Sequence, residues 1–205
     1  MTRTFTRSLI VGVLIFLTGC AARYRPVVPP RVYYFNKESH DGIEVSYKYE
    51  VLRDAGNRKF AKKELKKYVK VVAVKVTNKS DAAITVGKDV VFYVGDMQLY
   101  QLEPVQVKRA IKQNVPAYLP YILLTFLQLN VTENNTVNTY PIGLVIGPGV
   151  TIGNMVVAST ANKNLLRELE EYNLWGRTIA PGETVYGLIG LGGTNYGSIS
   201  LRKIK

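Results

Sequence analysis

The chain has 205 residues, with 27 Lys and Arg against 15 Asp and Glu, and a formal net charge of +12. Its single cysteine, Cys20, excludes an internal disulfide framework. Its single histidine, His40, lies in the polar stretch KESHDG, and HExxH, paired CxxC and acidic calcium-loop motifs do not occur. We therefore expect no metal site, no cofactor and no enzymatic activity.

The first nineteen residues have the order of a bacterial signal peptide. Arg3 and Arg7 supply positive charge, residues 9–17 are apolar, and two small residues follow. The apolar run is much shorter than the roughly 20 residues that a membrane-spanning helix needs. We expect residues 1–19 to be removed on export. Export in turn argues against nucleic acid as the partner of this basic chain.

The residues Leu17-Thr18-Gly19-Cys20 resemble the lipobox of bacterial lipoproteins. The resemblance implies cleavage before Cys20 and acylation of that cysteine by chains such as palmitate, so that the protein is membrane-anchored. The alternative is an ordinary signal peptide followed by a free thiol, which an oxidising compartment disfavours. Ala21, and not aspartate, follows the cysteine. By resemblance to sorting in Gram-negative bacteria, this favours the outer membrane, with the protein facing the periplasm.

Prolines and arginines dominate the residues that follow the cysteine. The stretch 20–31 holds three of each. Because proline favours extended backbone, we expect a short, semi-rigid tether here. Its arginines would lie close to anionic lipid headgroups and be attracted to them.

Short β-branched or alternating segments, separated by polar turns, predict strands over residues 32–36, 43–52, 68–80, 83–87, 89–95 and 97–103. The second of these alternates apolar and polar residues, which indicates one buried and one exposed face. Gly95 and Asp96 predict a tight connection between two of the strands. Residues 53–67 are polar and basic, and predict a loop with a helical turn at KFAKKELKK, or a solvated short amphipathic helix that carries the basic residues.

The middle of the chain, about residues 104–176, is an apolar insertion. Residues 104–114 predict a short helix, and an amphipathic helix is expected near the end of the insertion, over residues 162–176. Between them, residues 115–129 and 141–158 contain no charged side chain. These two segments could be ordinary core packed against the strands, a hairpin in the membrane leaflet beside the lipid, or a surface that binds a partner protein. Pro148 argues against a membrane span.

Strands are expected again over residues 178–191, after a turn at Pro181-Gly182, and over 198–204. The glycine-rich stretch 190–197 precedes a strand and not a helix, so it predicts a hairpin turn and not a phosphate-binding loop. The segments VAVKVTNKSDAAITVG and TIAPGETVYGLIGL resemble small immunoglobulin-like domains of bacterial lipoproteins. The resemblance implies an antiparallel β-sandwich over residues 32–205, interrupted by the insertion.

Two functional hypotheses follow. The first is a lipid-anchored, non-catalytic adaptor or assembly factor for a cell-envelope complex, with the insertion as its contact surface. Aromatic side chains dominate interface energies, so the candidate anchors are Tyr118, Tyr121, Phe126 and Trp175. The second is a periplasmic module that binds peptidoglycan or another anionic glycan through the basic residues Lys62, Lys63, Lys66, Lys67 and Lys70.

Overall fold

The computed structural model describes residues 20–133, 136–193 and 197–204. The expected signal peptide and the first three lipobox residues lie outside this range. The chain divides into two units. One contains residues 113–161 together with the chain up to Arg23, and we call it the apolar unit. The other contains residues 24–112 and 162–205, and we call it the β-rich unit.

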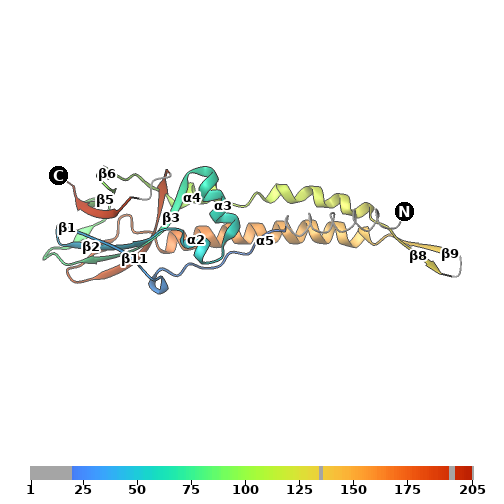
Figure 1. Cartoon of the computed structure of the whole chain (residues 1–205), viewed down its shortest axis with the longest axis horizontal. Helices are drawn as coiled ribbons and strands as arrows, with labels where there is room; N and C mark the ends of the chain where they lie inside the picture. The colour runs from blue at the N-terminus through green and yellow to red at the C-terminus, as the bar shows by residue number, and fades with distance from the viewer. Residues whose placement is uncertain (1–19, 134–135, 194–196, 205) are drawn as a thin grey trace. The chain divides into compact units, whose positions relative to one another are not determined.

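The larger sheet of the β-rich unit has five antiparallel strands in the order β1-β2-β3-β11-β7 (Figure 1). The strands are β1 (Asn36–His40), β2 (Ile43–Lys48), β3 (Val69–Asn78), β11 (Thr184–Gly192) and β7 (Gln101–Leu102). In β2, Ile43, Val45 and Tyr47 are buried and alternate with half-buried polar residues. The alternation predicted for this segment is therefore confirmed. The central strand β3 is buried along most of its length.

A second sheet has the order β12-β5-β6, and a short two-stranded ladder joins β10 to β4. These strands are β12 (Ile199–Lys203), β5 (Val90–Val94), β6 (Met97–Gln98), β10 (Thr178–Ile179) and β4 (Ile84–Thr85). Apolar side chains from both larger sheets form one buried cluster, which includes Val74, Phe92, Ile189 and Leu201. The β-rich unit is thus built from antiparallel sheets over a common core, with added helices.

The helices of the β-rich unit are η1 (Pro29–Arg31), α2 (Val51–Asp54), α3 (Arg58–Lys67) and α4 (Pro104–Ile111). Helix α4 matches the short helix expected there. Its start is set by a capping box, in which the side chains of Glu103 and Gln106 satisfy backbone N–H groups reciprocally. Helix α3 corresponds to the short amphipathic helix that was one of the two expectations for this segment, and α2 was not expected. Phe60 and Ala61 on α3 are buried. Packing of these apolar residues stabilises the helix, although most of its sequence is charged.

The apolar unit contains a 3-10 helix, η2 (Val115–Phe126), a hairpin of β8 (Leu129–Glu133) and β9 (Thr136–Tyr140), and the first part of α5 (Gly143–Glu171). Helix α5 continues to Glu171 in the β-rich unit. The two segments expected as a Pro-interrupted apolar stretch and a separate amphipathic helix are therefore one helix. Pro148 lies close to its beginning, where few backbone hydrogen bonds are lost.

Two further expectations are wrong. Residues 32–35 are not a strand, since β1 begins at Asn36 and takes in the polar stretch that ends at His40. Asp41 and Gly42, both with positive φ, form the turn into β2. The connection after β11 is not a hairpin, because β11 pairs with β3 and β7 while β12 pairs with β5.

Candidate functional site

The apolar unit is almost free of charge. Between Lys112 and Lys163, Glu133 is the one charged residue of the sequence. The chain passes between the two units after residues 23, 112 and 161. Basic residues lie within two positions of every passage, namely Arg23, Arg25, Lys112 and Lys163. An uncharged segment bracketed by basic residues is typical of chains that enter a membrane beside anionic headgroups.

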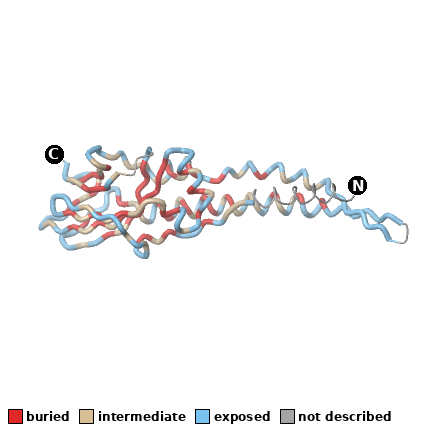
Figure 2. Tube along the Cα trace, viewed as in Figure 1, coloured by how far each residue is buried: buried red, intermediate tan, exposed pale blue. Residues whose placement is uncertain are grey.

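Most described residues of this unit are exposed (Figure 2). Many of them have large apolar side chains. Phe126 and Val145 are 81% and 80% exposed. The exposed set is Leu119, Ile122, Leu123, Phe126, Leu127, Leu129, Val131, Val137, Tyr140, Ile142, Leu144, Val145, Ile146, Ile152 and Val156. A surface of this kind marks a membrane or protein contact, because monomeric soluble proteins rarely expose one. These side chains are exposed and do not form a core. For them, the hypothesis that the insertion is ordinary core packed against the strands is therefore wrong.

Glycines set the internal packing of the apolar unit. A Cβ at Gly143 would overlap the Leu124 carbonyl oxygen, and a Cβ at Gly147 would lie 2.5 Å from the Thr125 backbone nitrogen. Only glycine allows η2 to approach α5 this closely. By contrast, a Cβ at Gly149 or Gly153 would meet nothing within 4 Å. The helix therefore has one packed face and one open face.

The residues that follow Cys20 are fixed to this unit. The Ala21 N–H donates to Asn154 Oδ1 on α5 over 2.6 Å. The Ala22 N–H donates to Gln113 Oε1 over 3.0 Å, and Gln113 Nε2 donates back to the Ala22 carbonyl over 2.6 Å. Cys20, next to this anchored pair, is exposed. A lipid on its sulfur would therefore start beside α5, in the same unit as the exposed apolar side chains.

Helix α5 is long enough and apolar enough to cross a membrane, and only 22% of its most apolar window is buried. Length and composition alone do not distinguish such a helix from a buried core helix. The exposure of its side chains distinguishes the two, because a core helix is covered by the rest of its own protein.

The four candidate aromatic anchors do not form one surface. Tyr118 is buried, and its ring stacks on that of half-buried Tyr121 at 6.2 Å, so both belong to the packing of the apolar unit. Phe126 is exposed on η2. Trp175 belongs to the β-rich unit, where its indole covers Gly87. Phe126 is thus the one of the four that belongs to the exposed apolar surface described above.

The five lysines of the basic segment differ in their exposure. Lys62, Lys66 and Lys67 are exposed on α3. Lys63 is half-buried and donates from Nζ to the Lys112 carbonyl. Burial, and then the neighbouring charges of Lys67, Lys112 and Lys59, lower the pKa of Lys63. Lys70 is buried on β3. Three of the five lysines therefore remain open to an anionic surface.

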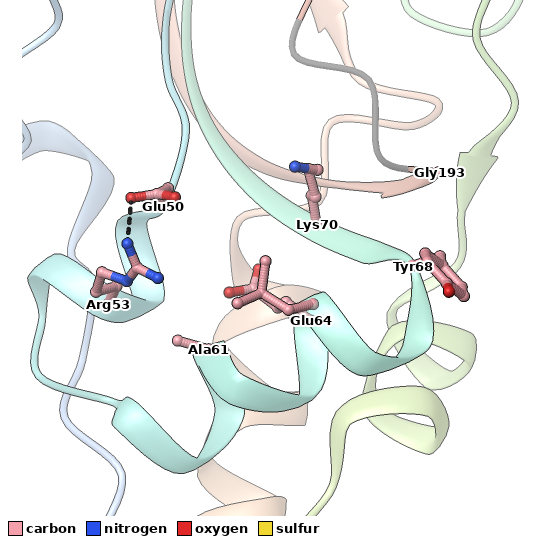
Figure 3. A pocket seen from close by; sticks show the side chains of 8 residues that line it. Glu50, Arg53, Ala61, Glu64, Tyr68, Lys70 and Gly193 are labelled. Carbon is pink, nitrogen blue, oxygen red and sulfur yellow. Dashed lines mark hydrogen bonds and ion pairs between the residues drawn. The ribbon is translucent and has the colours of Figure 1, made fainter.

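A small cavity of about 100 Å³ lies beside Lys70 (Figure 3). It is lined by Glu50, Arg53, Ala61, Glu64, Leu65, Tyr68, Lys70 and Gly193. Glu64 is 8% exposed and accepts a hydrogen bond from the Val71 N–H over 2.7 Å. Burial raises the pKa of Glu64 to about 7. Arg53 and Glu50 form an ion pair at 3.0 Å at the rim.

Sequence reasoning missed Glu64, although it is the one acid in the run RKFAKKELKK. An acidic residue on a helix with many lysines is usually expected to be solvent-exposed and to pair with one of them. The signal was its spacing from Phe60, four residues earlier, which places both on the same face of α3. Glu64 joins α3 to β3 through its hydrogen bond with the Val71 N–H, which is a structural role.

No family model matches this chain, and neither the curated proteins nor the solved structures with which it was compared include a match.

Proposed function

We propose that this chain is a lipid-anchored, non-catalytic envelope protein whose apolar unit enters the membrane that holds the lipid on Cys20. Its β-rich unit, an immunoglobulin-like sandwich in this proposal, remains in water and acts as an adaptor or assembly factor for an envelope complex. The protein is attached to the outer membrane in this proposal, and its β-rich unit faces the periplasm. The observation that carries the proposal is the exposed, nearly uncharged surface in the same unit as Cys20, the expected lipidation site.

The energetics favour lipid contact. Fully burying one Leu, Ile, Val or Phe side chain gives about 1.5–3 kcal/mol, so that several together give on the order of 10 kcal/mol. The exposed apolar side chains therefore add substantially to the attachment that a lipid on Cys20 provides.

Backbone chemistry and length also favour insertion. Hydrogen bonds within α5 and η2 satisfy most of their own backbone polar groups, which is the requirement for entering hydrocarbon. Asn154 holds the residue next to Cys20. From Asn154 back to Gly143, α5 covers about 16 Å at 1.5 Å per residue. That is about half of a hydrocarbon core roughly 30 Å thick.

Vesicle flotation tests the membrane part of the proposal. The mature chain from residue 20, carrying Cys20→Ser, is mixed with vesicles of phosphatidylethanolamine and phosphatidylglycerol and centrifuged in a density gradient at high salt. We expect the chain to float without any lipid of its own. Adding Phe126→Asp and Val145→Asp should return it to the bottom fractions, because both side chains would bring charge into hydrocarbon.

The matched control carries Tyr33→Asp and Tyr100→Asp, which are 71% and 86% exposed in the β-rich unit. It should float like the parent. If the Cys20→Ser chain stays at the bottom, the apolar surface does not enter lipid and the membrane part of the proposal fails.

The adaptor role is tested by pull-down of the lipidated protein in mild detergent. An envelope protein that is retained by the parent and by the Phe126→Asp, Val145→Asp variant is bound through the β-rich unit. If neither protein retains an envelope partner, the adaptor role fails.

The second candidate, binding to an anionic glycan, is favoured by the three exposed lysines of α3. It predicts retention on purified sacculi that decreases with salt and is lost when Lys62, Lys66 and Lys67 are changed to Gln.

A further inference from the structure

The β8–β9 hairpin is exposed along both strands. All ten residues of the two strands are exposed, and β8 and β9 pair only with each other among the described strands. A two-stranded hairpin of this size is at best marginally stable in water by itself. Each of its outer edges also presents unpaired backbone N–H and C=O groups, which form a template for a further strand.

The sequence of the hairpin leaves these edges unprotected. Soluble proteins protect edge strands with lysine, proline or inward-pointing charges. The strands LNVTE and TVNTY contain neither lysine nor proline, and Glu133, at the turn, is their one charge. The residues are mostly Thr, Asn, Val and Tyr, of which the β-branched and aromatic ones favour strands. Nothing in this composition opposes pairing with another strand.

The two faces of the hairpin differ in chemistry. The register pairs Asn130 with Thr139, and their side chains are hydrogen-bonded over 2.8 Å. Thr132 and its partner Val137 lie on the same face. The opposite face carries Leu129 against Tyr140 and Val131 against Asn138, with Glu133 against Thr136 at its end. Along β8, residues 129–132 alternate apolar and polar side chains, which is the pattern of membrane-inserted β structure with one face toward lipid and one toward water. Strand β9 does not follow this alternation.

Length places the hairpin in the far half of the bilayer. The hairpin continues beyond the N-terminal end of α5 within the apolar unit (Figure 1). Strand β8 has five residues, which cover about 17 Å at 3.4 Å per residue. Together with the helix segment from Asn154 to Gly143, the unit reaches about 33 Å, against a hydrocarbon core of roughly 30 Å. Glu133 would then reach water on the opposite side.

We infer that β8 and β9 pair edge to edge with the hairpins of further copies of this chain, forming a membrane-embedded ring of hairpins. This inference rests on the membrane insertion proposed above. Unpaired strand edges are not stable in hydrocarbon, and only a closed arrangement satisfies both edges of every hairpin. A ring of identical chains closes in this way, since β9 of one copy meets β8 of the next.

Disulfide cross-linking between two tagged populations tests the inference. One full-length population carries Val131→Cys and the other carries Asn138→Cys. The two positions are cross-strand partners at the same level of the hairpin. They would therefore approach one another where neighbouring hairpins pair without a shift along the strands. Each chain has one added cysteine, and the lipidated Cys20 has no free thiol. A disulfide between the two tags is therefore intermolecular.

We expect the two tags to cross-link in membranes at least tenfold more than a control pair that carries Ser39→Cys in both populations. Ser39 is exposed on β1, at the edge of the large sheet of the β-rich unit. Thr132→Pro should abolish the cross-link and reduce the detergent-solubilised oligomer to monomer, because proline removes a backbone donor. Thr132→Ser should leave both unchanged.

The outcomes separate this inference from the proposal beneath it. A chain that floats with vesicles but cross-links no more than the Ser39 control overturns hairpin pairing and leaves membrane insertion intact. A chain that cross-links but does not float supports pairing between copies and overturns its location in the membrane.

Discussion

Glu168 on α5 accepts a hydrogen bond from the phenol of Tyr24, and both side chains are buried in the β-rich unit. The same carboxylate accepts the N–H groups of Val27 and Val28, at 2.8 and 3.2 Å. The Tyr24 ring packs edge-on against Phe60 at 5.6 Å. Burial, together with the charge of Glu168, raises the pKa of Tyr24 well above its usual range. The proline-rich stretch that follows Cys20 is therefore held in place by a buried carboxylate.

Changing Glu168 to Ala should lower the free energy of unfolding of the β-rich unit by about 2–4 kcal/mol, because it leaves a buried phenol and two backbone donors without their acceptor. Glu168→Gln retains one acceptor oxygen and should cost less. Urea denaturation of the chain from residue 20, in mild detergent, measures both effects. Glu170→Ala, at an exposed position on the same helix, is the control and should change stability by less than about 0.5 kcal/mol. Equal effects at the two positions would contradict a special role for Glu168.

Glu64 should make the β-rich unit less stable at alkaline than at acidic pH. Its pKa is about 7 in the folded protein against a normal value of 4.5, so the folded state binds the proton more tightly. The resulting stabilisation is complete below pH 4.5 and is lost as the pH rises through 7. We expect the free energy of unfolding to differ by roughly 2–3 kcal/mol between pH 4.5 and pH 8, because each tenfold difference in proton affinity contributes about 1.4 kcal/mol.

Urea titrations of the parent and of Glu64→Gln at several pH values check this expectation. The variant keeps an acceptor for the Val71 N–H and should lose most of the pH dependence in this range. Glu170→Gln should keep the dependence of the parent. A Glu64→Gln variant whose stability falls between pH 4.5 and pH 8 as steeply as that of the parent would refute the assignment.

The strands of the β-rich unit could be predicted because their signals are local. The alternation in β2, the β-branched run of β3, and the turns at Gly95-Asp96 and Pro181-Gly182 all lie where expected. Which strands pair with one another was harder to predict. The glycine-rich stretch after β11 looks like a hairpin turn, yet the neighbouring strands belong to different sheets. Which sheet a strand joins depends on contacts distant in sequence, and no local pattern carries them.

The apolar unit was misjudged for a physical reason. Its glycines and Pro148 have poor intrinsic helix propensity, and that argues for loops. In the structure Gly143 and Gly147 serve the close approach of η2 to α5, a tertiary contact that outweighs propensity. The absence of charge was visible in the sequence, but it is shared by core, membrane and interface segments. Exposure of the side chains separates these alternatives, and a sequence does not give exposure.

Asn78, at the end of β3, should be essential to the connection that follows it. Its side chain is fully buried, donates to the carbonyls of Ala82 and Ile179, and accepts from the Ser80 N–H and hydroxyl. Asn78→Ala should lower the unfolding free energy by about 2–4 kcal/mol, and Asn78→Asp should also destabilise because a carboxylate cannot donate to the two carbonyls. Thr77→Ala, at a half-buried position of the same strand, should cost less than about 1 kcal/mol. Equal stability of Asn78→Asp and the parent in urea would show that the two donated bonds contribute little.

Two glycines in α5 should respond in opposite directions to the same substitution. Gly147→Ala places a methyl group 2.5 Å from the Thr125 backbone nitrogen, so η2 must separate from α5. We expect faster proteolysis of the apolar unit in detergent and a lower melting temperature. Gly149→Ala adds its methyl group to open space and should stabilise the helix by about 1 kcal/mol, the difference in propensity between glycine and alanine. If both variants lost stability, close packing of η2 on α5 would not explain the glycine at position 147.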